Sequence, residues 1–226
     1  MAEAAVDRLL KLVEDVRSVV DLRAYFDQGD GGQVPMFSGA RFESLGGGGD
    51  IPEHRNRITS WDLVAVKCLS VDVPINVSLD LLEGDLGDQI ASYLEDIPTD
   101  IDLGDDGASA HVAPGSPAQL AWQALVDQTD IGWVTAGKLL ARKRPRLIPV
   151  WDSVVRCAYH VPKGHDEWVW LDDLLRQRGG ALALAVAVVR DEAALGVDVS
   201  VLRTLDVILW MRHRNQHRSR RCPGLQ

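Results

Sequence analysis

Apolar residues recur at the spacing of an α-helix along most of this 226-residue chain, and no other feature of the sequence restricts the fold as strongly. The first such segment covers residues 4–26, where apolar and charged side chains follow the pattern of one amphipathic helix. Later segments with the same period cover residues 60–70, 77–82, 85–96, 117–128, 133–142, 150–160, 166–178, 181–194 and 198–214. No apolar run alternates over the length of a strand, so the sequence predicts a mainly α, multi-helix globular fold.

Capping residues and glycines mark where several of these helices begin and end. Thr59 and Asp62 have the spacing of a capping box at the start of a helix. Ser116 followed by Pro117 is typical of another helix N-terminus, because the hydroxyl caps the backbone and proline suits the first turn. Residues 28–57 contain two Gly-rich runs, which interrupt the segment too often for a regular helix or strand. We expect an ordered loop there, and long loops in compact domains often carry function.

Charge is distributed unevenly along the chain, whose formal net charge is −9. Residues 1–115 contain 22 Asp and Glu against 8 Lys and Arg, whereas residues 116–226 contain 11 against 16. The sequence therefore predicts an acidic N-terminal helical region with the Gly-rich loop and a basic C-terminal helical region, packed as one compact two-lobed unit. A basic region is typical of proteins that contact phosphates, although surface charge that is merely uneven explains the same counts.

Several classes of protein are not supported by the sequence. No window of eighteen apolar residues is present, and the N-terminus is acidic where a secretory signal would be basic, so we expect a cytoplasmic protein without a membrane partner. Cys68, Cys157 and Cys222 lie far apart and form no C-x-x-C pair. His213 and His217 have the spacing of a helical metal pair, but arginines surround them and no third ligand is in view. We therefore expect neither a metal nor a cofactor, and the sequence does not predict an oligomeric state.

The segment from residue 117 to residue 142 has the outline of a helix-hairpin-helix, with helices expected at 117–128 and 133–142. Two helices are joined by a tight turn at "TDIG", and Gly132 allows a backbone to approach the turn closely. Backbone N–H groups at such a turn, together with the dipole of the second helix, can hold a phosphate of double-stranded DNA. Basic side chains follow in the second helix and just beyond it. The residues expected to contact DNA are Gly132, Trp133, Thr135, Lys138, Arg142, Lys143, Arg144 and Arg146.

The stretch "GWVTAGKLLARKRPRLIPVWD" resembles the signature of the helix-hairpin-helix base-excision DNA glycosylases, over residues 117–156. Gly132, Thr135 and Ala136 match the end of the family's hairpin, and Pro149 with Asp152 match the motif that closes it. The whole chain is also similar to a bacterial domain family of unknown function. The first resemblance implies a glycosylase-like fold that binds double-stranded DNA and excises a damaged or modified base.

That resemblance assigns the catalytic role to Asp152. An anion fixed beside the sugar stabilises the positive charge that develops when an N-glycosidic bond breaks. Trp151 beside it could stack on a base, and Glu43 in the Gly-rich loop could serve as general acid to the leaving base. Bifunctional members of the family, which also act as lyases, carry a catalytic lysine at the position that Val134 occupies here. The resemblance therefore implies a monofunctional enzyme. The simpler interpretations are that Asp152 caps the helix after Pro149 and that Glu43 is solvated.

Two functions without catalysis compete with this interpretation. A non-enzymatic nucleic-acid-binding module would keep the hairpin and use Lys143, Arg144 and Arg146 only for phosphate contacts. A protein-interaction module would use the acidic and basic halves as complementary surfaces. The choice of base lies in the shape of a pocket, which the spacing of residues does not reveal.

Overall fold

The computed structural model describes residues 2–27, 35–161, 166–196 and 198–218. Within them every regular element is helical and no strand occurs, which confirms the mainly α prediction. The α-helices are α1 (Ala2–Val13), α2 (Arg17–Phe26), α3 (Ser60–Cys68), α4 (Ile75–Glu83), α5 (Asp85–Glu95), α6 (Ala108–Val112), α7 (Pro117–Val126), α8 (Trp133–Lys143), α9 (Ser153–Tyr159), α10 (Glu167–Glu192) and α11 (Val201–Arg218). Two 3₁₀ turns, η1 (Ser38–Arg41) and η2 (Leu45–Gly47), lie in the Gly-rich loop.

Local sequence signals locate several helix boundaries correctly. Thr59 and Asp62 form both hydrogen bonds of the predicted capping box at the start of α3. Ser116 caps α7 by accepting a hydrogen bond from the backbone N–H of Gln119, and Pro117 occupies the first turn. The confirmed caps therefore fix the N-termini of α3 and α7.

Two predicted boundaries need correction. Residues 4–26 do not form one helix, because the chain turns between α1 and α2, where the Asp15 carboxylate accepts a hydrogen bond from the backbone N–H of Arg17. In α10 the two predicted segments are joined into one element, but its backbone leaves helical geometry from Gln177 to Gly180. Gly179 and Gly180 have positive φ angles there, which glycine adopts without a steric penalty. The helix is therefore kinked near the place where the sequence predicted a break.

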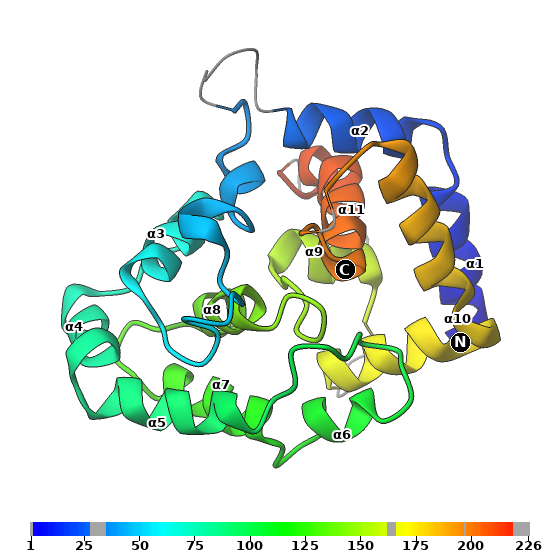
Figure 1. The fold of residues 1–226 in the computed structure, drawn as a ribbon. Coiled ribbons are helices and arrows are strands. Elements are labelled where there is room, and N and C mark those ends of the chain that lie inside the picture. The colour runs from blue at the N-terminus through cyan, green and yellow to red at the C-terminus, as the bar shows by residue number, and fades with distance from the viewer. Residues whose placement is uncertain (1, 28–34, 162–165, 197, 219–226) are drawn as a thin grey trace.

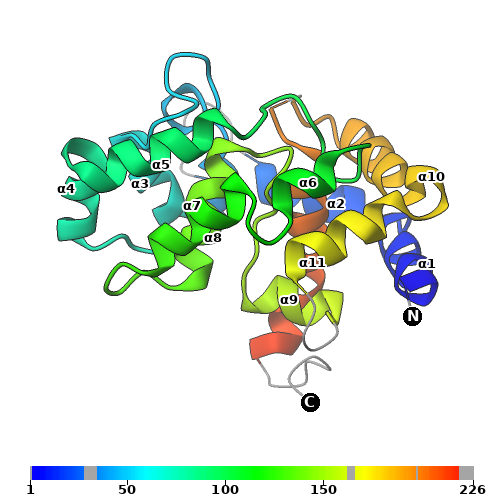
Figure 2. The same ribbon diagram turned by 90° about the horizontal axis from the view of Figure 1, so that it is seen from below.

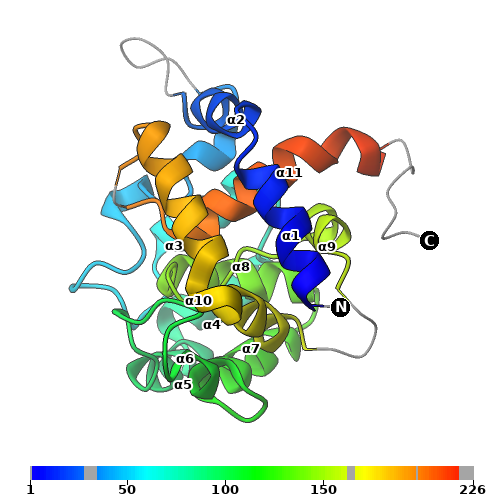
Figure 3. The same ribbon diagram turned by 90° about the vertical axis from the view of Figure 1, so that its right-hand side faces the viewer.

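The helices pack in two groups (Figures 1 and 2). Helices α3, α4, α5, α7 and α8 pack on one another and form the middle group, whereas α1, α2, α9, α10 and α11 form the terminal group. Figure 3 shows α1 lying against α10, so the N-terminal helix packs on a helix from the last third of the chain. Helix α6 contacts both α7 and α10, and one continuous hydrophobic core runs through both groups. The predicted acidic region, residues 1–115, and the predicted basic region, residues 116–226, each contribute helices to both groups.

Membrane insertion has no support in the described part of the chain, where no helix combines the length and apolar character needed to cross a bilayer.

Candidate functional site

Asp152 begins α9 and caps it, as its position after Pro149 predicted. Its Oδ1 atom accepts a hydrogen bond of 2.9 Å from the backbone N–H of Val155. Among the described residues the side chain forms no other hydrogen bond, so its second oxygen is not used by the cap. The capping interpretation is confirmed, and the cap also holds the carboxylate in a fixed orientation.

The Asp152 side chain lines a pocket of about 300 Å³, which we call the Asp152 pocket. Lys138 from α8 and Asp206, Trp210 and Arg214 from α11 line the same pocket. Its walls thus come from the middle group, the terminal group and the chain segment that joins α8 to α9. A volume of this size lies at the lower end of the range of pockets that hold small organic molecules.

Lys138 is buried in this pocket rather than exposed for phosphate contact, which corrects the sequence prediction. Its side chain is 4% exposed, and Nζ donates a hydrogen bond of 2.9 Å to the carbonyl oxygen of Leu69. Burial lowers the pKa of the Lys138 ammonium, while the carboxylates of Asp152 and Asp206 act in the opposite direction. Lys138 therefore supplies a hydrogen-bond donor inside the pocket.

Asp206 and Arg203 form a buried ion pair on α11 that the sequence reasoning missed. Burial raises the pKa of Asp206 to about 7, Arg203 opposes this rise, and the charge of Asp152 adds to it. Arg203 also donates hydrogen bonds to the hydroxyl of Tyr25 at 2.8 Å and to the carbonyl oxygen of Gly39 at 3.0 Å. The available sequence signal was two charged residues, three positions apart, in the otherwise apolar stretch "VLRTLDVILW".

Aromatic side chains line the same pocket beside these polar groups. The rings of Tyr25 and Phe37 are stacked with centroids 5.2 Å apart, and Trp210 meets both rings edge-on. The guanidinium of Arg214 lies 4.8 Å from the centroid of Phe37 and 5.0 Å from that of Trp210. Aromatic faces together with a few polar groups are suited to a flat heterocyclic ring.

Glu43 does not line the Asp152 pocket, so its predicted role as general acid to a base held beside Asp152 is corrected. Its Oε1 atom lies 2.7 Å from Nε of Arg203, and both side chains are buried. Phe42 beside it is buried in the core, and Glu43 is not solvated, which corrects the alternative interpretation as well. Burial raises the pKa of Glu43, and Arg203 opposes that rise.

Arg142, Lys143 and Arg144 are buried as well, which corrects their prediction as DNA contacts. Arg142 and Lys143 both pair with the buried carboxylate of Asp62, at 3.1 Å and 2.6 Å. Their remaining donors, and those of Arg144, bind oxygens of the loop and of α5, so no charge is left to reach a phosphate. The acceptors are the backbone carbonyls of Phe42, Glu43, Leu45, Gly49, His54, Arg55, Leu94, Ile97 and Lys143 and the side chain of Asn56.

The turn between α7 and α8 places the other predicted DNA contacts differently. Gly132 is the N-cap of α8, and a Cβ built on it would meet no atom within 4 Å, so the backbone there is open. Thr135 is buried, and Trp133 is half-buried with its carbonyl oxygen accepting from Trp122. Arg146 is partly exposed, but its guanidinium pairs with Asp102 at 2.5 Å. The turn thus keeps an accessible backbone but few free cations.

Trp151 is buried and faces another part of the structure, so its predicted stacking on a base in the Asp152 pocket is corrected. Its ring stacks on Tyr159 with centroids 4.8 Å apart. It lines a separate pocket of about 270 Å³ together with Trp122, Trp133 and Trp168. This tryptophan pocket does not include Asp152.

Comparison with known proteins assigns a family but no activity. A family model described as "Family of unknown function (DUF6308)" matches residues 18–213, in agreement with the similarity to such a family noted in the sequence. No curated protein and no solved structure matches the chain. The comparisons identify no helix-hairpin-helix glycosylase segment.

Proposed function

The chain belongs to the family of unknown function DUF6308, and we propose that its Asp152 pocket receives a base turned out of double-stranded DNA and that Asp152 promotes hydrolysis of the N-glycosidic bond. The observation that carries this proposal is the combination of groups in one pocket. A carboxylate with one oxygen outside its cap shares the pocket with Lys138, Asp206 and the aromatic rings of Phe37 and Trp210.

In the proposed reaction Asp152 acts on the sugar. Departure of the base leaves positive charge on the deoxyribose, and a fixed anion next to that charge lowers the barrier. The same carboxylate can orient the water that then attacks the sugar. The hydrogen bond from Val155 supports this role, because it holds the carboxylate in place before the reaction.

The base would lie among the aromatic and polar groups of the pocket. Phe37 and Trp210 line the pocket, and the Arg214 guanidinium that lies over both rings offers its own flat face to a base. Asp206, with its pKa near 7, retains a proton often enough at neutral pH to protonate the departing base. Lys138 supplies a second hydrogen-bond donor, and its positive charge favours the build-up of electrons on the base before that proton is transferred.

Contacts to the DNA backbone would come from two places. Arg214 and Arg218 line the Asp152 pocket from the end of α11. The open backbone at Gly132, with α8 behind it, supports the proposed hairpin contact to a phosphate. The buried run Arg142–Arg144 has no part in this proposal.

The test uses duplex oligonucleotides that each carry one damaged or modified base. We expect the wild-type protein to leave abasic sites in at least one of these duplexes, detected by strand cleavage in hot alkali. Asp152→Asn should lower that rate by about a hundredfold or more, because the transition-state charge loses its counter-charge. Asparagine is itself a good N-cap, so the variant should remain folded.

Asp166→Asn provides a matched control. Asp166 caps α10 by accepting hydrogen bonds from Trp168 and Val169, and it does not line the Asp152 pocket. Equal rates in wild type and Asp152→Asn would refute the catalytic role. Salt-dependent binding of duplex DNA without excision of any base would instead favour the non-enzymatic nucleic-acid-binding module. Failure to bind DNA at low salt would refute both.

A further inference from the structure

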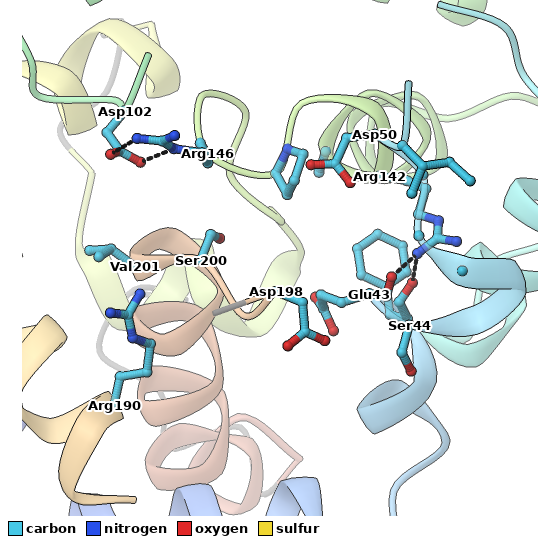
Figure 4. A pocket seen from close by; sticks show the side chains of 17 residues that line it. Glu43, Ser44, Asp50, Asp102, Arg142, Arg146, Arg190, Asp198, Ser200 and Val201 are labelled. Carbon is cyan, nitrogen blue, oxygen red and sulfur yellow. Dashed lines mark hydrogen bonds and ion pairs between the residues drawn. The ribbon is translucent and has the colours of Figure 1, made fainter. Parts of the chain in front are cut away.

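A second large cavity lies apart from Asp152, between the Gly-rich loop and the start of α11 (Figure 4). It has a volume of about 680 Å³ and is lined by the loop residues 42–44 and 47–51, by the end of α8 with Pro145 and Arg146, and by Arg190 and Asp198 of the terminal group. We call it the loop cavity. Neither Asp152 nor Lys138 lines it, so it is a second site, independent of the proposed glycosylase pocket.

Hydrogen-bond acceptors in the loop cavity lack partners. The Glu43 side chain is 6% exposed, its Oε1 atom is paired with Arg203, and its Oε2 atom is buried without a hydrogen bond. The hydroxyl oxygen of Ser44 is also buried without a hydrogen-bond partner. Figure 4 shows the carboxylates of Glu43 and Asp198 pointing toward one another in the cavity. Since an unsatisfied buried acceptor is costly, a ligand that donates hydrogen bonds would be stabilised here.

The charges that remain unpaired in the loop cavity are negative. Arg142 is satisfied by Asp62 and backbone carbonyls, and Arg146 pairs with Asp102. Arg190 pairs with the neighbouring Asp191 at 3.2 Å, outside the set of lining residues. Among the described residues, by contrast, Asp198 forms no ion pair or side-chain hydrogen bond, and Asp50 interacts only at longer range with the charge of Arg144. A cation in the cavity would therefore meet the carboxylates of Asp50 and Asp198. It would also meet Oε2 of Glu43, whose other oxygen is paired with Arg203.

We propose that the loop cavity binds a small organic diammonium ion, held by Glu43 and Ser44 at its inner end and by Asp50 and Asp198. Each ammonium group carries three hydrogen-bond donors and no acceptor, which matches the unpaired acceptors and charges. The volume fits a whole small molecule rather than a bare ion. The described residues contain no group of three or more His, Cys, Asp or Glu side chains placed to hold a metal, so an organic cation is the better match.

The experiment measures binding of putrescine to the full chain by isothermal titration calorimetry. Butylamine, with one ammonium group, and 1,4-butanediol, with none, serve as probes with the same four-carbon chain. We expect putrescine to bind at one site per chain, butylamine to bind about tenfold more weakly and butanediol not to bind. Asp198→Asn and Asp50→Asn should each weaken putrescine binding about tenfold, and Glu43→Gln should weaken it at least as much.

Two variants separate specific binding from other effects. Asp88→Asn removes the same charge from an exposed position on α5, outside all the pockets described above, and should leave putrescine binding unchanged. Equal weakening in Asp88→Asn and Asp198→Asn would show general attraction to an acidic protein and overturn the proposal. Equal affinity for putrescine and butylamine, or no binding at all, would overturn it too. Asp198 and Asp50 are not fully buried, so these variants keep the test valid if Glu43→Gln fails to fold.

Asp152→Asn should bind putrescine like the wild type. The loop cavity and the glycosylase proposal can therefore fail independently of one another.

Discussion

Two buried ionic clusters lie close to the Gly-rich loop, and they differ in how completely their groups are satisfied. The clamp cluster, formed by Asp62, Arg142, Lys143 and Arg144, places its cations against one carboxylate and many backbone carbonyls. The junction cluster, formed by Glu43, Arg203 and Asp206, has two carboxylates on one guanidinium and borders both proposed sites. A cluster without spare acceptors holds the structure together, whereas one with an unpaired acceptor and a raised pKa is available for chemistry.

Asp62→Ala is expected to have the largest effect on stability. It removes the counter-charge of both Arg142 and Lys143 and one half of the capping box of α3. Breaking a buried ion pair by deleting one partner costs about 3–5 kcal/mol, because the other charge stays buried. Urea unfolding of the variant should therefore show a loss in this range.

Asp102→Ala is the matched surface deletion, since Asp102 pairs with Arg146 where both side chains are partly exposed. Its loss should lie within about 0–1 kcal/mol. Equal losses for the Asp62 and Asp102 variants would mean that the clamp cluster does not hold the loop.

Arg203→Met should produce a smaller loss that depends on pH. The variant leaves Glu43 and Asp206 buried without their guanidinium, but both carboxyls can escape the penalty by binding a proton. We expect a loss of about 2–3 kcal/mol at pH 8 and a smaller one at pH 5, measured by urea unfolding. A loss that is the same at both pH values would show that these carboxyls do not titrate in the folded protein.

Asp206→Asn should mainly change how steeply the free energy of unfolding varies with pH. The folded pKa of Asp206, about 7, is above its ordinary value of 3.8, so the wild type binds a proton more tightly when folded. That contribution is complete below about pH 4 and is lost as the pH rises to 7, by at most about 1.4 kcal/mol per pH unit. Asparagine does not titrate in this range, so the free energy of unfolding of the variant should not fall in this way. Parallel stability curves for the two proteins between pH 4 and 7 would contradict the raised pKa.

Local signals in the sequence predict much of the helical framework but not the fate of the charged residues. The caps at Thr59 and Ser116 depend on neighbours within three residues, so the sequence contains all that is needed to locate α3 and α7. The burial of Arg142 and Arg144 depends on carbonyl oxygens that are 45 or more positions away along the chain. No pattern within α8 distinguishes a cation that faces such carbonyls from one that faces solvent.

The Asp152 pocket likewise combines one feature that the local sequence predicts with others that depend on tertiary packing. The position of Asp152 follows from Pro149 and the start of the next helix, which is local information. Its proximity to Asp206 in the same pocket follows from the packing of α9 on α11, which brings residues more than fifty positions apart together. The sequence therefore predicted the carboxylate but not its partners.

The clamp cluster also makes the backbone conformation of the Gly-rich loop independent of most of the loop's side chains. Arg142 and Lys143 bind main-chain oxygens, which every residue type provides, so these bonds are indifferent to which side chain each loop position carries. Gly49 is an exception, because a Cβ there would lie 2.1 Å from the carbonyl oxygen of Arg142. Positions such as Ser44 and Asp50 can mutate without breaking any of these bonds. Substitutions that change the lining of the loop cavity at such positions should therefore leave the backbone of the loop in place.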